Sequence, residues 1–318
     1  MLKEGVSVII CCYNSGWIIK RCLEALKNQN VRKGLAWEIV IVDNNCSDNT
    51  IEEAMDTMAN CNIEFRVVYE KTPGLLYARK KGIAEVKYTY TIYCDDDNLL
   101  CPEYVDTMYG ILSSNPNIGA AGGMGLPEFE CAPDPRIVPY IYNYAVGSQI
   151  HHSEWLYGAG LALRTDIVRD IYYSQKCYLV GRKGNIVLAG DDGELVRSIR
   201  IRGLKLVAKD EITFTHVLHK KRLTWEYFVN MTDGFLLTNP VIKTMDCVLH
   251  NSPFNIIRPK LTSVIAGVIL RLPFSYCLLT RLSIHRLIIN YKAYKLWSDN
   301  QLMSIYNDWH NMYKKYNN

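Results

Sequence analysis

The sequence lacks several patterns, and each absence removes a class of protein. Its 11 cysteines form no CxxC pair, and some, such as Cys12 and Cys94, lie in apolar runs where cysteine acts as a small buried hydrophobe. We therefore expect reduced thiols in place of a disulfide framework or a zinc site. No GxGxxG follows the first apolar run and no GxxxxGK[ST] occurs, which excludes a dinucleotide fingerprint and a P-loop.

The sequence also has a small net charge, and its first residues do not resemble a secretion signal. The net charge is only +4, and 49% of the residues are apolar, so composition excludes wholesale disorder and gives no reason to expect a nucleic-acid partner. The start, MLKEGVSVII, lacks a basic segment followed by a long apolar stretch and a cleavage site. We expect it to be the first strand of a domain, and we expect a cytoplasmic location, with peripheral contact to the inner face of the membrane as an option.

The first hundred residues alternate between two kinds of pattern. Apolar, β-branched runs at 6–12, 38–42, 65–69 and 90–94 predict buried parallel strands, and helical patterns lie between them. This order predicts right-handed βαβ units in a doubly wound sheet of the α/β class. From about Trp225 onward the chain is predicted to be helical.

Polar residues follow every one of these four strands. They are Tyr13-Asn14, Asp43-Asn44, Glu70-Lys71 and the triplet Asp95-Asp96-Asp97. Because ligands of doubly wound sheets bind beyond the carboxyl ends of the strands, we expect all four points to converge on one crevice. Polar residues that simply begin loops would explain any single pair, but three adjacent carboxylates repel one another unless a cation or solvent relieves them. Such oxygen ligands suit Mn²⁺ or Mg²⁺ bridging the phosphates of a nucleotide.

Five blocks of sequence resemble one known family. VSVIICCYN, IVDNNCSDNT, EKTPGLLYARKKGI and YCDDDN, in this order, are similar to the family 2 glycosyltransferases of the GT-A fold, and GDDGELVRSIRIRGLKL resembles that family's acceptor-side acidic motif. The resemblance covers roughly residues 6–228. It implies a doubly wound mixed sheet of Rossmann-like type with a donor-binding half at 1–125, an acceptor-binding half at 126–228 and a helical C-terminal extension at 229–318.

The resemblance also implies roles on the donor side. It implies inverting transfer of a sugar from a nucleotide diphosphate, with UDP as the expected nucleotide, to an acceptor hydroxyl. The donor-binding residues would be Tyr13, Asn14, Asp43, Lys71, Gly74, Arg79, Asp95 and Asp96. Asp97 would be the principal ligand of Mn²⁺ or Mg²⁺. His216, expected just after a strand at 211–214, would complete the metal shell or bind a diphosphate oxygen, although a lone histidine in an apolar stretch is often structural.

On the acceptor side the resemblance implies a general base. Asp192 would take the proton of the acceptor hydroxyl, and Asp191 would lie beside the acceptor. The alternative is that both aspartates cap the helix that follows. Trp155, Tyr157 and Gly158 would form the acceptor pocket, since aromatic faces stack on sugar rings, although aromatic residues are also ordinary core material.

Three positions depart from the family pattern. Cys12 stands where proline is common, Lys80 replaces an asparagine, and Asp191-Asp192 replaces Glu-Asp. These changes are conservative for the chemistry, and they leave the acceptor side less firmly assigned than the donor side.

Three other functions fit parts of the sequence. A sugar-1-phosphate nucleotidyltransferase normally carries a glycine-rich basic signature after its first strand, which CCYNSGWIIKR does not provide. A phosphotransferase with an aspartyl nucleophile would place its acidic motif after the first strand. A non-catalytic nucleotide-sugar sensor would need no base, whereas this chain carries both an acidic triplet and a second acidic pair.

The C-terminal part contains two apolar runs, at 261–270 and 272–280, separated by Arg271. Neither run reaches the roughly 18–20 residues needed to span a bilayer. Clustered cations and Trp297 beside them suit a helix in the headgroup layer, so we predict contact with an anionic membrane surface. A buried helical pair is the alternative. Such a surface would fit a glycan or glycolipid acceptor, as in assembly of a surface polysaccharide or a lipid-linked oligosaccharide.

Overall fold

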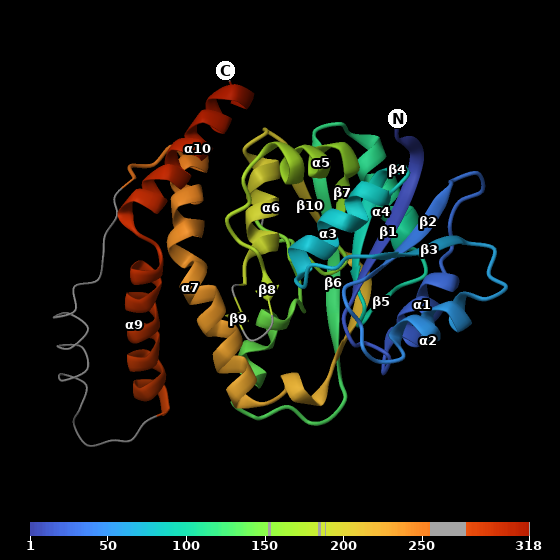
Figure 1. Cartoon of the computed structure of the whole chain (residues 1–318), viewed down its shortest axis with the longest axis horizontal. Helices are drawn as coiled ribbons and strands as arrows, with labels where there is room; N and C mark the ends of the chain where they lie inside the picture. The colour runs from blue at the N-terminus through green and yellow to red at the C-terminus, as the bar shows by residue number, and fades with distance from the viewer. Residues whose placement is uncertain (152–153, 184–185, 188, 255–277, 318) are drawn as a thin grey trace.

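Eight strands form one mixed sheet at the centre of the protein (Figure 1). The computed structural model describes residues 1–318 apart from 152–153, 184–185, 188, 255–277 and 318. The strand order is β3-β2-β1-β4-β7-β6-β10-β5. The bounds are β1 Lys3–Cys12, β2 Trp37–Asp43, β3 Glu64–Tyr69, β4 Tyr88–Asp95, β5 Asn98–Leu100, β6 Ile118–Phe129, β7 Ala162–Arg164 and β10 Lys205–Leu218. A separate hairpin pairs β8 Arg182–Lys183 with β9 Ile186–Val187.

The four strands predicted from the apolar runs are confirmed, and they pair in parallel with one another. β1 lies between β2 and β4, with Val8 opposite both Ile39 and Ile92, and β3 pairs with the outer edge of β2. The side chains of Val8 and Ile39 are fully buried. Branched apolar side chains favour this doubly covered, extended conformation.

Helices cover both faces of the sheet. One face carries α1 Ile19–Lys27, α2 Thr50–Met58 and α4 Tyr104–Ser114, and the other carries α3 Leu75–Glu85, α5 Thr165–Ser174 and α6 Asp191–Arg200. Adjacent residues of β1 show the division, because Ile10 packs with the first set and Ile9 with the second. The doubly wound mixed α/β sheet is therefore as predicted.

The second half of the sheet differs from the prediction in one respect. The strand expected at 211–214 is part of the longer β10, so His216 lies within a strand and does not follow one. β10 pairs in parallel with β6, and the register jumps between Lys209 and Thr213. This bulge contains polar residues, which hid the continuity of the strand. The proline-rich segment before β7 contains the 3₁₀ helix η1, Val138–Tyr144.

In the C-terminal part, α7 packs beside α6, and α9 and α10 pack against α7 (Figure 1). After the short η2, Lys220–Arg222, come α7 Trp225–Leu249, α9 Leu278–Leu296 and α10 Asp299–Asn317. Met245 of α7 and Trp309 of α10 are fully buried in a small core that also includes Leu179. The proposed division at residue 125 falls within β6, and that at 229 falls within α7.

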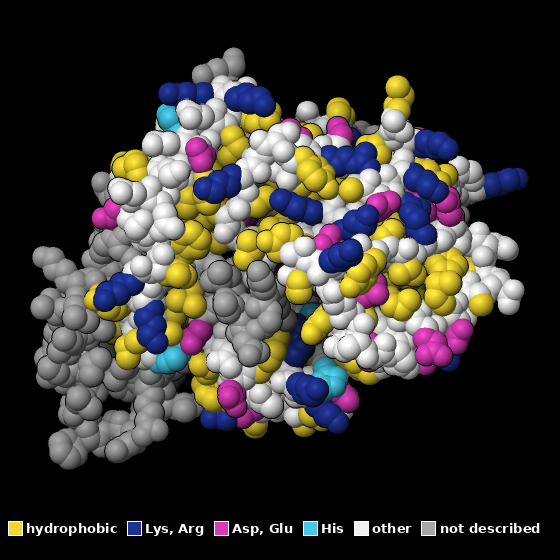
Figure 2. Space-filling model, in the orientation of Figure 1, with side chains coloured by type: hydrophobic (Ala, Val, Ile, Leu, Met, Phe, Trp, Pro, Cys, Tyr) yellow, Lys and Arg dark blue, Asp and Glu magenta, His cyan; other side chains and the backbone are white. Residues whose placement is uncertain are grey.

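Two surface features bear on membrane contact. Within the described ranges, no helix combines the length and the apolar character needed to cross a bilayer. The apolar runs at 261–270 and 272–280 lie wholly or largely outside the described residues. On the face shown in Figure 2, Lys and Arg side chains are spread over both the sheet domain and the C-terminal helices.

Candidate active site

Side chains at the carboxyl ends of β1, β2 and β3 hold the neighbouring loops together. The Asn14 side-chain oxygen accepts a hydrogen bond from the Ser47 N–H at 2.7 Å, which joins the loops after β1 and β2. Asn44, which is buried, donates to the carbonyl of Thr72 at 2.8 Å and accepts from the Gly74 N–H at 2.8 Å. Gly74 has φ 131°, a backbone conformation that favours glycine, and it begins α3.

The other predicted donor residues at these ends differ in exposure. The Asp43 carboxylate accepts a hydrogen bond from the Cys46 N–H at 2.8 Å, and this contact shapes the turn after β2. Tyr13 is 65% exposed, and Lys71 is also exposed. Both side chains are therefore accessible to a ligand that approaches the carboxyl ends of the strands.

The acidic triplet occupies the tight connection between β4 and β5. Asn98, which is fully buried, accepts from the Asp95 N–H at 3.3 Å and donates to the Asp97 carboxylate at 3.2 Å. Burial and the neighbouring carboxylate of Asp97 raise the pKa of Asp96 to about 7. The pKa of Asp95 is raised as well, chiefly by burial. The mutual repulsion expected from the sequence is therefore present, and a bound cation would relieve it.

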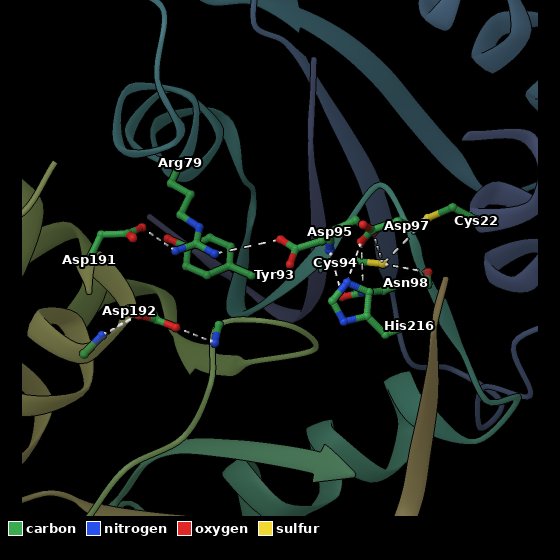
Figure 3. Close-up of polar contacts among 12 residues, drawn as sticks. Cys22, Arg79, Tyr93, Cys94, Asp95, Asp97, Asn98, Asp191, Asp192 and His216 are labelled. Atoms are coloured by element: carbon green, nitrogen blue, oxygen red, sulfur yellow. Dashed lines mark hydrogen bonds and ion pairs between the residues drawn. The ribbon is translucent and has the colours of Figure 1, made fainter. Parts of the chain in front are cut away.

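Two thiols lie beside Asp95 and Asp97 (Figure 3). The sulfur atoms of Cys22 and Cys94 are 3.8 Å apart, and both lie within 3.7 Å of the Asp95 carbonyl oxygen. The ten cysteines in the described part of the chain are free.

Asp97 is surrounded by basic side chains. Its Oδ1 lies 3.4 Å from His216 Nε2, and its Oδ2 accepts a hydrogen bond from Arg222 Nη1 at 2.8 Å. His216 is 97% buried and is fixed by a 2.7 Å contact between its Nδ1 and the Tyr144 carbonyl. Since a carbonyl only accepts, Nδ1 carries the proton, and in the neutral ring Nε2 presents its lone pair toward Asp97.

The residues around Asp97 suit a divalent cation. A carboxylate oxygen and an imidazole nitrogen are ligands that Mn²⁺ accepts, and their separation is close to that of adjacent ligands on one metal. Among the described residues, no three His, Cys, Asp or Glu side chains form a complete metal-binding group. Phosphate oxygens commonly supply the remaining ligands of such ions, so the pair fits a metal held jointly by protein and diphosphate.

Arg79 lies between the acidic triplet and the second acidic pair, Asp191-Asp192 (Figure 3). Its guanidinium, only 4% exposed, lies 2.9 Å from the Asp191 carboxylate and 3.9 Å from the Asp95 carboxylate. It also lies over the ring of Tyr93, 4.9 Å from the ring centre. Burial alone would lower the pKa of Arg79, but the two carboxylates outweigh it and raise that pKa. Arg79 therefore stays charged and holds the two acidic motifs together.

Asp191 and Asp192 begin α6 and point in different directions. Asp191 binds Arg79, whereas the Asp192 carboxylate accepts a hydrogen bond from the Gly158 N–H at 3.1 Å. A side chain at position 158 would come within 2.8 Å of the Arg79 guanidinium and would have to displace it, so glycine suits the close passage of the backbone between Arg79 and Asp192. Asp192 lines the large cavity next to the site, and Asp191 does not.

The cavity has a volume of about 600 Å³ and a mixed lining. Its walls come from η1, the segment around Trp155, the N-terminal turns of α6, one face of α7, and Arg286 of α9. Trp155 meets the ring of Tyr157 edge to face, with ring centres 5.8 Å apart. Tyr157 is 96% buried, and its hydroxyl accepts from the Gly125 N–H at 2.7 Å. Trp155 is thus the more accessible of the two predicted pocket aromatics.

Three residues organise the site in ways that were not predicted from the sequence. Asn44 was expected at the crevice as part of the pair Asp43-Asn44, but its hydrogen bonds to the Thr72 carbonyl and the Gly74 N–H were not predicted. The hydrogen bonds of Asn98 to Asp95 and Asp97 were not predicted either. Arg222 belongs to the run Lys220-Lys221-Arg222, which is typical of a solvated basic surface. Its contact with Asp97 depends on a turn that brings residues 125 positions apart together.

Comparison with known proteins relates this geometry to one family. Residues 7–164 match the family described as Glycosyl transferase family 2. The chain is 30% identical over 107 residues to the cholesterol galactosyltransferase of Borreliella burgdorferi, an alignment that covers 34% of this chain and 29% of that protein. It is 28% identical over 120 residues to the poly-beta-1,6-N-acetyl-D-glucosamine synthase of Staphylococcus epidermidis, covering 38% and 28%. This chain therefore aligns with less than a third of either relative.

Relatives that align over more of the chain have lower sequence identity to it. The glucosyl-dolichyl phosphate glucuronosyltransferase of Haloferax volcanii is 23% identical over 239 residues, 70% of this chain and 72% of that protein. S. aureus TarS 1-349, solved in complex with UDP-GlcNAc, has a TM-score of 0.54 at 13% identity and covers 98% of this chain and 92% of its own. The mannosyltransferase PcManGT of Pyrobaculum calidifontis, solved with GDP-Man and Mn²⁺, has the same TM-score and identity, with 98% and 86% covered.

Proposed function

The chain carries a family 2 glycosyltransferase domain with the GT-A fold, and from this premise we propose that it transfers a sugar from a nucleotide diphosphate to an acceptor hydroxyl. The observation that supports this most is the pairing of two acidic motifs on opposite sides of Arg79. One motif suits a metal and a diphosphate, and the other presents a carboxylate to a cavity of about 600 Å³.

The proposed donor is a nucleoside diphosphate sugar, with UDP as the first nucleotide to test. Asp43 and the exposed Tyr13 hold the nucleoside, and Asp95 and Arg79 lie toward the ribose and diphosphate. Asn14, Lys71, Gly74 and Asp96 complete the rim of this donor site. Asp97 and His216 would hold Mn²⁺ or Mg²⁺, which would supply positive charge beside the leaving diphosphate.

In the proposed reaction Asp192 acts as the general base. The acceptor oxygen forms a bond to the anomeric carbon while the bond from that carbon to the diphosphate oxygen breaks, and the acceptor proton passes to the Asp192 carboxylate. Attack from the face opposite the leaving group inverts the configuration of the anomeric carbon. The hydrogen bond from the Gly158 N–H orients this carboxylate toward the cavity.

We assign the cavity to the acceptor because of its lining. Trp155 and Tyr142 offer aromatic faces on which sugar rings stack. Phe235, Leu236 and Ile242 of α7 form an apolar wall. A sugar attached to a lipid or another apolar group would use both kinds of surface, which supports a surface glycan or a lipid-linked oligosaccharide as the acceptor. Contact of the C-terminal part with the inner, anionic face of the membrane would bring such an acceptor close.

A thermal-shift panel of nucleotide sugars, with and without Mn²⁺, tests this proposal. Ligands that bind only the folded state raise the unfolding temperature. We expect one group of donors that share a nucleotide to raise it, and to do so more strongly with Mn²⁺. No stabilisation by any UDP-, GDP-, ADP- or dTDP-sugar in either condition would contradict the proposed function.

A further inference from the structure

Arg222 occupies the position at which a metal would balance the charge of Asp97. Its Nη1 lies 2.8 Å from Asp97 Oδ2 and 3.3 Å from His216 Nε2, so one nitrogen contacts both predicted metal ligands. Burial alone would lower the pKa of Arg222, but Tyr227 and Asp97 outweigh it and raise that pKa. The guanidinium therefore provides a permanent positive charge at this point.

The same guanidinium is incompletely satisfied where it lies. Its Nε is buried and has no hydrogen-bond partner, which costs free energy because a buried donor has lost its bond to water. The side chain is 20% exposed, so it borders on solvent. It belongs to the three-residue turn η2. Because Arg222 lies on a short turn and its Nε–H makes no hydrogen bond, its side chain can adopt a second position more readily than an arginine whose N–H groups are all hydrogen-bonded.

A metal ion and Arg222 cannot both use these ligands. A divalent ion bound to Asp97 and His216 would lie about 2.0–2.2 Å from the ligand atoms. The Arg222 Nη1 already contacts both side chains, and two positive charges at such a distance repel strongly. The diphosphate of a nucleotide, in contrast, is a good partner for a displaced guanidinium, because arginine binds phosphate oxygens in a planar, bidentate arrangement.

We propose that Arg222 competes with the divalent cation for Asp97 and His216, and that the nucleotide diphosphate favours the exchange by binding the displaced guanidinium. This inference rests on the proposed function, because the exchange requires a diphosphate ligand. Its consequence is that the chain binds metal weakly without nucleotide and strongly with it. Metal and nucleotide then raise each other's affinity by the same factor.

Titration of Mn²⁺ without nucleotide tests the competition, because it needs neither donor turnover nor acceptor. The full chain is titrated as wild type, Arg222→Gln and Arg222→Lys, with Mn²⁺ binding followed by electron paramagnetic resonance of the free ion. Arg222→Gln removes the charge but keeps most of the stem beside Tyr227, and Arg222→Lys keeps the charge. Arg32→Ala is the matched control, since Arg32 forms an exposed ion pair with Asp106 and lies outside the site.

We expect Arg222→Gln to bind Mn²⁺ roughly tenfold more tightly than the wild type, within the usual range of such couplings. Arg222→Lys and Arg32→Ala should stay within about twofold of the wild type, because each leaves a cation at the site. Equal or weaker Mn²⁺ binding by Arg222→Gln would overturn the inference and would show that Arg222 only supports the loop. A second Mn²⁺ titration of the wild type with UDP present tests the proposed function separately. That function requires Mn²⁺ and nucleotide to bind together, whether or not Arg222 competes with the metal.

Discussion

At the residue scale, Asp191 and Asp192 show how two identical neighbours acquire different roles. Asp191 forms a buried ion pair with Arg79 at 2.9 Å, and burial raises its pKa despite that pairing. Asp192 lies at the cavity and receives a hydrogen bond from Gly158. The other Asp192 oxygen accepts a hydrogen bond from the Gly193 N–H at 2.8 Å, a contact within the first turn of α6 of the kind that the capping alternative expects. The sequence pointed to Asp192 through its place in the resembling motif, whereas its orientation follows from its hydrogen bond with the Gly158 N–H.

Substitution of each aspartate by asparagine should separate these roles. Asp192→Asn should keep donor binding and lose roughly 10²–10⁴-fold in transfer rate, the usual contribution of a positioned base. Asp191→Asn should instead lower the free energy of unfolding by about 3 kcal/mol, because it leaves the buried charge of Arg79 poorly compensated. Steady-state rates and chemical denaturation measure the two effects. Unchanged turnover in Asp192→Asn would remove it from the mechanism.

Other residues show what sequence alone leaves hidden. The triplet Asp95-Asp96-Asp97 was predictable because adjacent carboxylates after a buried strand are unusual. The roles of Asn44 and Arg222 were not, because each depends on partners brought close only by the fold. Side-chain contacts across long sequence separations leave no local pattern to read.

At the element scale, the N-terminus of α6 connects the acceptor side to the segment before it. Glu194, which is 97% buried, accepts hydrogen bonds from the N–H groups of Tyr178 and Leu179 at distances of 2.7–3.0 Å. Burial raises the pKa of Glu194 to about 7 from its ordinary value of 4.5. A folded-state pKa above the unfolded value means that the folded protein binds the proton more tightly. The stabilisation is therefore complete below pH 4.5 and is lost as the pH rises through 7.

Glu194→Gln should remove this pH dependence. Between pH 5 and pH 8 the free energy of unfolding of the wild type should fall by about 2–3 kcal/mol more than that of the variant. The variant loses one acceptor for the Tyr178 and Leu179 N–H groups, so it should be the less stable protein at pH 5. Urea denaturation at a series of pH values measures both effects. Parallel stability curves for the two proteins would show that Glu194 stays ionised in the fold.

The strands illustrate which elements the sequence predicts well. β1 to β4 were predicted to within a few residues because their apolar runs are continuous and rich in branched side chains. β10 was predicted only in part, since Lys209 and Asp210 interrupt the apolar pattern at its bulge. At a bulge the strand continues along the sheet, but the extra residues interrupt the regular pattern of apolar residues in the sequence.

At the scale of the whole molecule, the C-terminal helices belong to the folded body. Trp309 of α10 and Val241 of α7 are fully buried against each other's helices and against Leu179. A protein truncated after residue 255 would therefore expose an apolar core. Its loss of membrane binding could not be distinguished from unfolding. The family match favours the glycosyltransferase prediction over a nucleotidyltransferase, which the sequence motifs alone had left open.

Membrane contact is best tested in the full chain. We expect flotation with vesicles that contain anionic lipid, and we expect it to weaken with salt because the ionic attraction is screened. Substitution of Arg271 and Arg281 by glutamate should reduce flotation, because it reverses the charge beside the apolar runs. The same change at Arg32, which lies outside the 261–295 segment, should leave flotation unchanged. Equal flotation of all three proteins, or none by the wild type, would contradict contact through the 261–295 segment.

We propose that Asp97 and a divalent ion together hold the diphosphate of a sugar nucleotide. Calorimetric titration of UDP into the wild type, Asp97→Ala and the control Asp106→Ala, each with and without Mn²⁺, measures this joint binding. We expect Mn²⁺-dependent binding in the wild type and the control, and its complete loss in Asp97→Ala, because the diphosphate no longer shares a cation with the protein. Mn²⁺-dependent affinity in Asp97→Ala equal to that of the wild type would contradict it.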